Sequence, residues 1–550
     1  MPDRSVRRAM APAGIRLRRW AQAAGQALLP RREVAEEAPV AARVRAVRFA
    51  RDHPVATAWG LAALSAAIAY RHLLGSSLLL GGGLGTLPAS PAGFFQELVS
   101  GIRHTGLGGN TAASPALGLL GAGSILTLGD PALLGRILLL SLPVAAAVGC
   151  YRSVRSATED PISSVVAGAC YGLSSAVLWA VSEGRIPALV ALAGLPWMAG
   201  KLVLPFDHLG AIRTRRWVVG TALGLAVLIS FYAGTMLAAG VLVAAAVLVP
   251  QETARRARGL MLVGAALLVA ALLMFPLSID LARSWFGSMR DLAGEPSFAA
   301  LARLSLGPGP GSWPTGFFLP GVAALALLFV ADRYRMTALR AGVAAVASLY
   351  LGWLAAAGYL PAALSNPVAY VGVAAFSCSL LAGLGLASLL QGMSRTAFGL
   401  RQLGTALMVA LITVGLFGQL AQAGNASWAV GGPDRIPASY PVAGEAGGPP
   451  YRVLWLGSPS GDAFPAPGGL PTGTVAAGAA SVRFGVTDPG EPPLSTSAGR
   501  TWGRATTACA CRWPRSWRAR PGTRGRSSPP SASASSWPTR ATFRAPRFDG

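Results

Sequence analysis

Residues 161–206 read PISSVVAGACYGLSSAVLWAVSEGRIPALVALAGLPWMAGKLVLPF. Two apolar runs flank the charged tripeptide Glu183-Gly184-Arg185, and each is about long enough to cross the ~30 Å hydrocarbon layer of a bilayer as a helix. Pro187 suits the first turn of the second helix, where its missing N–H costs nothing. The stretch therefore predicts a helical hairpin that crosses a membrane twice and presents an acid and a base at one surface.

The composition extends this prediction to the whole chain. Of the 550 residues, 53% are hydrophobic and 13% are charged, and the mean hydropathy is +0.50. Soluble domains carry about 25% charged residues, so this chain is far outside that class. The net charge of +25 does not indicate nucleic-acid binding, because the arginines gather in an N-terminal arm, between apolar runs and in the tail. The five cysteines have no spacing typical of a metal site or a disulfide framework, and no cofactor or metal is expected.

The charges between the apolar runs predict the topology. Cytoplasmic loops of membrane proteins are enriched in Lys and Arg, and basic connections here alternate with nearly uncharged ones. The short, Gly-rich run 115–129 is ambiguous, but placing it at the outer interface puts every basic loop on the cytoplasmic side. We therefore predict an all-α polytopic domain of eleven spans, at residues 54–70, 131–150, 161–182, 187–206, 217–234, 236–251, 259–279, 316–331, 341–360, 366–391 and 403–423.

Four regions follow from this topology. Residues 1–53 form a basic cytoplasmic juxtamembrane arm with twelve arginines against five acids. Residues 54–423 form the transmembrane domain, with outer loops at 71–130 and 280–315. In residues 424–495 Gly and Pro rise, and 451–456 and 479–486 read as strands, which predicts the start of an extracytoplasmic α/β or β domain. Residues 496–550 carry eleven arginines from Arg500 onward and are either a disordered tail or the product of a shifted reading frame, which resequencing the gene would decide.

Four stretches of the sequence resemble a known family. LLGGGLGTLPASPAGFFQELVSGIRHTGLGGNTAASPALGLL (79–120) resembles the first outer loop in the membrane region of large actinobacterial family 2 glycosyltransferases. AGACYGLSSAVLWAVSEGRIPALVALAGLPWMAGKL (167–202) resembles the paired spans that follow there, and YRVLWLG and SVRFGVTDPG resemble the start of that family's extracytoplasmic domain. The likeness covers roughly residues 54–495, and the architecture is similar to the GT-C class of lipid-linked sugar transferases.

The resemblance implies a multi-pass plasma-membrane module of a cell-envelope glycosyltransferase. Its partners would be membrane lipids, a polyprenyl-phosphate-linked sugar and a separate soluble glycosyltransferase domain. Family members usually carry a nucleotide-sugar-binding domain before the first span, and residues 1–53 are too short to hold one. Enzymatic activity of the chain by itself is therefore left open. A transporter or flippase of a lipid-linked substrate and a non-catalytic membrane scaffold are the alternatives, although the scarcity of ionisable residues at mid-membrane depth counts against transport.

Candidate catalytic residues lie in the first outer loop. GT-C enzymes usually place a catalytic acid there, and this loop offers Glu97 and, at its membrane edge, Asp130. Either carboxylate could act as a general base toward an acceptor hydroxyl, with Arg103 and His104 nearby for substrate binding. The alternative for Glu97 is an interfacial helix over 91–103 whose polar residues face water. The alternative for Asp130 is capping of the helix that starts at the next residue.

Further candidates for substrate binding lie at other outer connections. Glu183 and Arg185 could hold a phosphate-bearing lipid head group through the Arg185 guanidinium, or could be an ordinary charged turn. Asp280 and Arg283 start the loop 280–315, and an interfacial ion pair is the alternative to a binding site.

Overall fold

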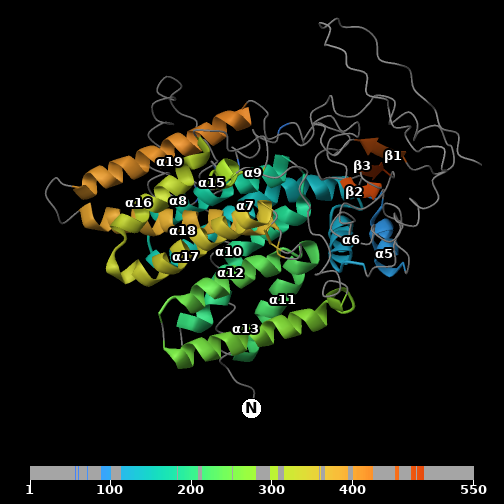
Figure 1. Ribbon diagram of the computed structural model, residues 1–550, viewed down its shortest axis with the longest axis horizontal. Coiled ribbons are helices and arrows are strands. Elements are labelled where there is room, and N and C mark those ends of the chain that lie inside the picture. The colour runs from blue at the N-terminus through green and yellow to red at the C-terminus, as the bar shows by residue number, and fades with distance from the viewer. Residues whose placement is uncertain are drawn as a thin grey trace, which may run out of the picture.

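The helical part of the chain is a bundle of long apolar helices. The computed structural model describes residues 90–100, 113–182, 184–207, 214–250, 252–279, 298–306, 315–357, 366–393 and 400–424, three strands between 453 and 487, and a few isolated positions. The helices are α5 (Pro91–Val99), α6 (Ala116–Leu126), α7 (Pro131–Thr158), α8 (Pro161–Gly172), α9 (Ser175–Ser182), α10 (Ile186–Asp207), α11 (Thr214–Phe231), α12 (Thr235–Leu248), α13 (Thr253–Leu273), α15 (Phe298–Ala302), α16 (Phe318–Phe329), α17 (Arg335–Ala356), α18 (Pro367–Met393) and α19 (Leu400–Gly424) (Figure 1).

Seven of these helices are long and apolar enough to cross a membrane, and an eighth span results if the bent pair α8–α9 counts as one. This confirms the prediction of a polytopic α-helical membrane protein. Helices α12 and α16 fall on two further predicted spans but have only 14 and 12 residues. The predicted first span, 54–70, lies outside the described residues except for isolated positions. The full count of eleven therefore stays a prediction.

The stretch 161–206 folds as a hairpin, with one difference from the prediction. Helix α10 begins at Ile186, so that Pro187 lies in its first turn as expected. The first arm is not one straight helix, because α8 ends at Gly172 and α9 starts at Ser175 with a bend of 41°. The arm still crosses the bundle from end to end.

Helix α18 lies at the centre of the bundle and contacts α7, α8, α10, α12, α16, α17 and α19. Of its membrane-crossing window, 89% is buried, against 61% or less for every other candidate span in the described residues. Small residues permit this close packing. A Cβ atom at Gly383 would lie 2.7 Å from a methyl group of Val154 and 2.9 Å from the Cβ atom of Ala167, so α7 and α8 approach the α18 backbone directly at this glycine.

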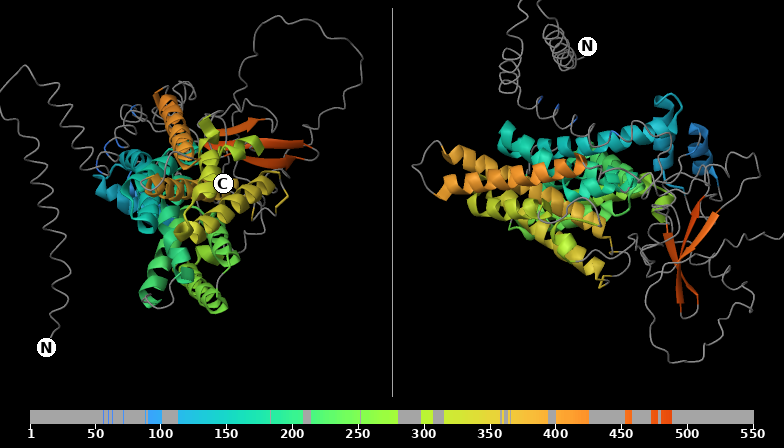
Figure 2. Two further views of the ribbon diagram at one scale, coloured as in Figure 1. Left: turned by 90° about the vertical axis from the view of Figure 1, so that its left-hand side faces the viewer. Right: turned by 90° about the horizontal axis from the view of Figure 1, so that it is seen from above.

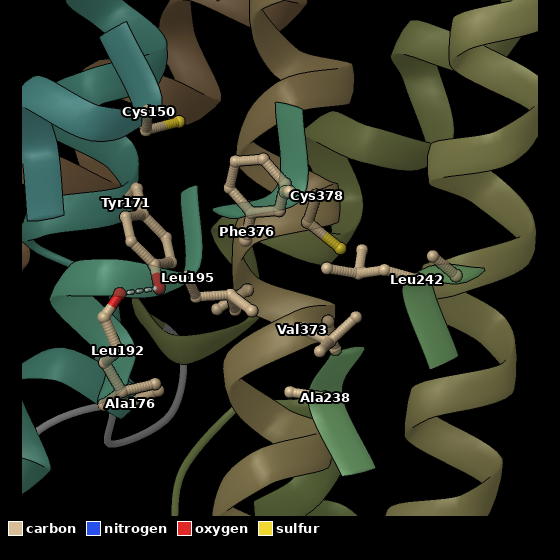
Figure 3. Packing of buried hydrophobic residues seen from close by; sticks show 14 of the residues in the cluster. Cys150, Tyr171, Ala176, Leu192, Leu195, Ala238, Leu242, Val373, Phe376 and Cys378 are labelled. Atoms are coloured by element: carbon tan, nitrogen blue, oxygen red, sulfur yellow. Dashed lines mark hydrogen bonds between the residues drawn. The ribbon is translucent and has the colours of Figure 1, made fainter. Parts of the chain in front are cut away.

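Two prolines inside α10 free backbone carbonyl groups that neighbouring helices satisfy. A helical carbonyl normally accepts from the N–H four residues later, and Pro196 and Pro205 have none to give to Leu192 and Lys201. The Tyr171 hydroxyl of α8 donates to the Leu192 oxygen at 2.7 Å, and the Trp217 indole of α11 donates to the Lys201 oxygen at 3.2 Å. Buried carbonyl groups inside a membrane need such partners. Figure 3 shows the Tyr171 bond, with the Phe376 ring of α18 edge-on at 5.9 Å.

The charged side chains of the described helices divide unequally between the two ends of the bundle. One end, here called the basic end, carries the arginines that end α7 and start α11, α13 and α17. Hydrogen bonds tie these helix ends together, from Trp217 to Lys201 and from the Tyr334 hydroxyl to the Thr158 oxygen at 3.5 Å. The opposite end carries α5, α6 and the start of α7. The described basic residues at the basic end are Arg152, Arg155, Lys201, Arg215, Arg216, Arg255, Arg256, Arg258, Arg333, Arg335 and Arg340, with the acids Glu159, Asp160, Glu252 and Asp332 among them. The opposite end carries the acids Glu97 and Asp130 and the basic residues Arg136, Arg185 and Arg303.

Three strands follow the helices. They are β1 (Val453–Gly457), β2 (Thr472–Ala477) and β3 (Ala480–Thr487), joined in the order β1-β3-β2 with both pairs antiparallel. The two predicted strands correspond to β1 and β3, whereas the Thr- and Gly-containing β2 was not predicted. In Figure 1 and in the right view of Figure 2 the strands lie at the same end of the bundle as α5 and α6. The predicted domain 424–495 and the predicted tail 496–550 lie mostly outside the described residues.

Candidate functional site

Helices α5 and α6 dock on the end of the bundle opposite the basic end, through a separate apolar cluster. The buried residues of this cluster come from α5, α6, α7 and α11, and Val190 of α10 packs against them. The hydroxyl of Ser114, just before α6, donates a hydrogen bond to the Ser230 carbonyl of α11. The run 115–129 was predicted not to span, and the 11-residue α6 is too short to cross a bilayer. The buried members of the cluster are Phe94, Ala116, Leu117, Leu120, Leu134 and Phe231.

Glu97 lies on α5 one turn after Phe94, on the side that faces this cluster. Its side chain is only 7% exposed, so the alternative of a water-facing polar residue is wrong. Glutamate is almost never buried to this degree unless it is paired or has a specific role. Glycines of α6 allow the close approach of α5, since a Cβ atom at Gly121 would lie 2.9 Å from the Phe95 ring. The fold thus buries a carboxylate at the end of the bundle opposite the basic end.

Asp130 caps α7. Its Oδ1 accepts hydrogen bonds from the backbone N–H groups of Ala132 at 2.8 Å and Leu133 at 3.1 Å. This is the capping geometry that was the alternative to a catalytic role. The geometry favours a structural role for Asp130 and leaves Glu97 as the buried acid of the first outer loop in its described part.

The turn between α9 and α10 presents Arg185. Gly184 has φ +61°, a left-handed conformation that favours glycine, and the Arg185 N–H donates to the Ala180 oxygen at 2.9 Å. The guanidinium carbon of Arg185 lies 5.0 Å from the centre of the Trp179 ring, which holds the cation at this end by a cation–π contact. The half-buried side chain is therefore oriented by α9.

Arg103, His104, Glu183, Asp280 and Arg283 lie outside the described residues. Within the described part of the chain, no group of three or more His, Cys, Asp or Glu side chains has the arrangement of a metal site.

Of the candidates that are described, Glu97, Asp130 and Arg185 come to the same end. The apolar cluster contains Phe94, three residues from Glu97, and Leu134, four residues from Asp130, and Val190, five residues from Arg185, packs against it. One carboxylate and one guanidinium that are distant in sequence therefore lie at the same end of the bundle, next to residues of one apolar cluster.

Sequence reasoning missed a polar junction at this end. The Tyr232 hydroxyl donates to Oδ1 of Asn366 at 2.7 Å, and the same oxygen accepts from the Ala369 N–H at 3.2 Å. Asn366 is 3% exposed and caps α18, so this junction fixes the end of the central helix to the turn after α11. The signal was available, because Asn366-Pro367 directly precedes an apolar run, as Asp130-Pro131 does.

Taken together, the fold defines a multi-pass helical membrane protein with a docked helix pair at the less charged end. No protein-family model and no curated protein matches the sequence.

Similar solved structures are membrane glycosyltransferases. Arabinofuranosyltransferase AftD from mycobacteria is similar with a TM-score of 0.48 and 17% identity, over 70% of this chain and 28% of that chain. The Archaeoglobus fulgidus oligosaccharyltransferase gives 0.43 and 12%, over 69% and 54%. ArnT from Cupriavidus metallidurans bound to undecaprenyl phosphate gives 0.41 and 16%, over 68% and 74%. The match spans less than a third of AftD, and at TM-scores below 0.5 nothing about the activity of this chain follows from these similarities.

Proposed function

We propose that this chain is the integral membrane module of a cell-envelope glycosyltransferase that handles a polyprenyl-linked sugar or glycan at the outer face. The observation that carries the proposal is the buried carboxylate of Glu97 on a helix pair docked at the end opposite the arginines. The resemblance of residues 79–120 to the first outer loop of family 2 glycosyltransferases supports it independently of the geometry.

The distribution of charge supports the orientation. Basic residues near membrane helices are retained in the cytoplasm, so the basic end lies inside and the opposite end outside. Glu97 and Arg185 then lie at the outer face, where a lipid-linked donor would present its sugar. The strands β1–β3, at the same end in Figure 1, would also be extracytoplasmic.

The chemistry proposed for this surface is transfer of a sugar from a polyprenyl phosphate to a hydroxyl. Glu97 accepts the proton of the acceptor hydroxyl while that oxygen bonds to the anomeric carbon. The bond from the anomeric carbon to the phosphate oxygen breaks, and polyprenyl phosphate leaves with the electron pair. The guanidinium of Arg185 suits the phosphate because its planar fork can donate two parallel hydrogen bonds.

A second candidate, a transporter or flippase, is favoured by one observation. The span α8–α9 is broken, and polar groups meet at the break, where Nε2 of Gln419 lies 3.4 Å from Oγ of Ser175 and Gln419 is fully buried. Broken helices with polar groups form substrate sites in transporters. The pair is neutral, however, and ion-coupled transport usually requires ionisable groups.

The orientation can be tested with reporter fusions. Fusions after residues 45, 155 and 257 are expected to report a cytoplasmic location, and fusions after 300 and 440 an outer one, because only that arrangement keeps the basic end inside. Residue 155 lies on α7 and residue 257 on α13, both at the basic end. A fusion at 300 that reports cytoplasm would refute the eleven-span count, and one at 440 that does so would refute the proposed outer site.

A further inference from the structure

The basic end contains a corner where positive charge is concentrated. Helices α10, α11 and α13 contact one another, and at this end the Phe206 ring of α10 lies against Gly259 of α13. The Trp217 indole bonds to the Lys201 oxygen, and Nζ of Lys201 lies 3.5 Å from the Gly220 oxygen. These bonds fix α10 to α11. We call this region the basic corner, made of Lys201, Arg215, Arg216, Arg255, Arg256 and Arg258.

The positive charge of the basic corner is only partly compensated by the protein. The same helix ends carry two acids, Asp207 and Glu252. Oε2 of Glu252 lies 3.1 Å from Nε of Arg255 and so neutralises one guanidinium. Arg215 and Arg216 are exposed and have no ion-pair partner among the described residues. An excess of cations therefore faces the membrane surface.

Helix dipoles add to the positive charge of the basic corner. Both α11 and α13 begin at the basic corner, at Thr214 and Thr253, and each helix N-terminus carries a partial positive charge. The two helices pack directly against each other, and both begin at the basic end of the bundle (Figure 1). An anion there would interact with two helix dipoles as well as with the side chains.

An exposed apolar surface adjoins the charges. Along α13, one to four turns after the arginines, the exposed fractions are 70% for Met261, 64% for Leu268 and 67% for Leu272. On α11, Val219 and Leu223 are 52% and 56% exposed. Cations at the membrane surface above apolar side chains at hydrocarbon depth match the two parts of a phospholipid.

From these features we propose that the basic corner is a binding site for an anionic phospholipid of the cytoplasmic leaflet, and that a lipid with two phosphates, such as cardiolipin, binds best. Basic pockets between membrane helices on the cytoplasmic side take such head groups. Two phosphates can engage guanidinium groups of both α11 and α13, whereas a zwitterionic head group offers no net charge. The site is at the other end of the bundle from Glu97 and does not depend on the proposed transferase activity.

Native mass spectrometry of the purified full chain in detergent tests this site. Cardiolipin and phosphatidylcholine are titrated separately, and cardiolipin adducts are expected at much lower lipid concentration and are expected to weaken as salt is raised. The double variant Arg215→Gln/Arg216→Gln should weaken cardiolipin binding roughly 25-fold, about five-fold for each charge removed near the membrane surface. The variant Arg215→Lys/Arg216→Lys should retain most of the binding because it keeps both charges.

The matched control removes two exposed arginines from another corner of the same end. Arg333 lies in the short 3-10 helix Asp332–Tyr334 that leads into α17, and its guanidinium stacks over the Tyr334 ring at 4.5 Å, while Arg335 is the first residue of α17. Arg333→Gln/Arg335→Gln should leave cardiolipin binding within about two-fold. Equal loss in both double variants would show general surface attraction and overturn the site. Equal binding of cardiolipin and phosphatidylcholine by the unmodified chain would overturn it even if a variant failed to fold.

Discussion

Replacing Glu97 with Gln is expected to lower the turnover of a polyprenyl-phosphate sugar by roughly 10²- to 10⁴-fold, the usual contribution of a positioned general base. Gln has nearly the same shape as Glu and can occupy the same buried position between α5 and α6, but it cannot accept a proton. The expected defect is therefore in the chemical step. It is measured as kcat for radiolabelled donor with the purified chain in lipid.

A control separates loss of the base from loss of a charge. Glu159, the residue that follows α7, is an exposed carboxylate at the basic end, far from the proposed site. Glu159→Gln should leave kcat within about two-fold, as expected for a surface change far from the chemistry. If Glu97→Gln also kept full kcat while the fold was intact, Glu97 would not be the base and the assignment would be wrong.

Removing the Tyr171 hydroxyl is expected to give the second large effect, on stability. Tyr171→Phe leaves the Leu192 carbonyl without a partner inside the bundle, because Pro196 has no N–H to supply. A buried carbonyl left unsatisfied lowers the free energy of unfolding by about 1–3 kcal/mol. Unfolding of the purified protein in a denaturing detergent measures the change.

The physical reason for that loss is tested by a double-mutant cycle. Pro196→Ala restores an N–H that can donate to Leu192, so Tyr171→Phe should cost less in the Pro196→Ala background by about 1 kcal/mol. Tyr350, which is 58% exposed on α17, provides the matched tyrosine, and Tyr350→Phe should change stability by less than about 0.5 kcal/mol. If the effects of the two changes at 171 and 196 were additive, the unsatisfied Leu192 carbonyl would not be the cause of the lost stability.

The helices that sequence reasoning placed well are those with a local start signal. Asp130-Pro131 and Asp160-Pro161 mark the first residues of α7 and α8, because a carboxylate accepts the free N–H groups of a first turn and proline fits there. Long apolar runs predicted membrane helices, because within one segment only a helix satisfies the hydrogen bonds of its own backbone in lipid. These signals lie within a few residues of one another, so a single sequence displays them.

The features that were missed depend on contacts between distant residues. The break between α8 and α9 is accompanied by the contact of Ser175 with Gln419, which is 244 residues away. The docking of α5 depends on contacts of Phe94 with α6 and with Phe231 of α11, and the pattern of α5 alone predicted an interfacial position. Helices α12 and α16 are shorter, at 14 and 12 residues, than the predicted spans 236–251 and 316–331, because apolar composition does not show where a helix ends. None of these contacts has a local signature.

The choice of donor tests the central claim most directly. The purified full chain in lipid is given a radiolabelled nucleotide sugar in one assay and a radiolabelled polyprenyl-phosphate sugar in another. We expect transfer from the polyprenyl-phosphate sugar and none from the nucleotide sugar, because the connections predicted on the cytoplasmic side of the spans are too short to build the soluble fold that positions a nucleotide diphosphate. Transfer from the nucleotide sugar, or from neither donor, would contradict the proposed function.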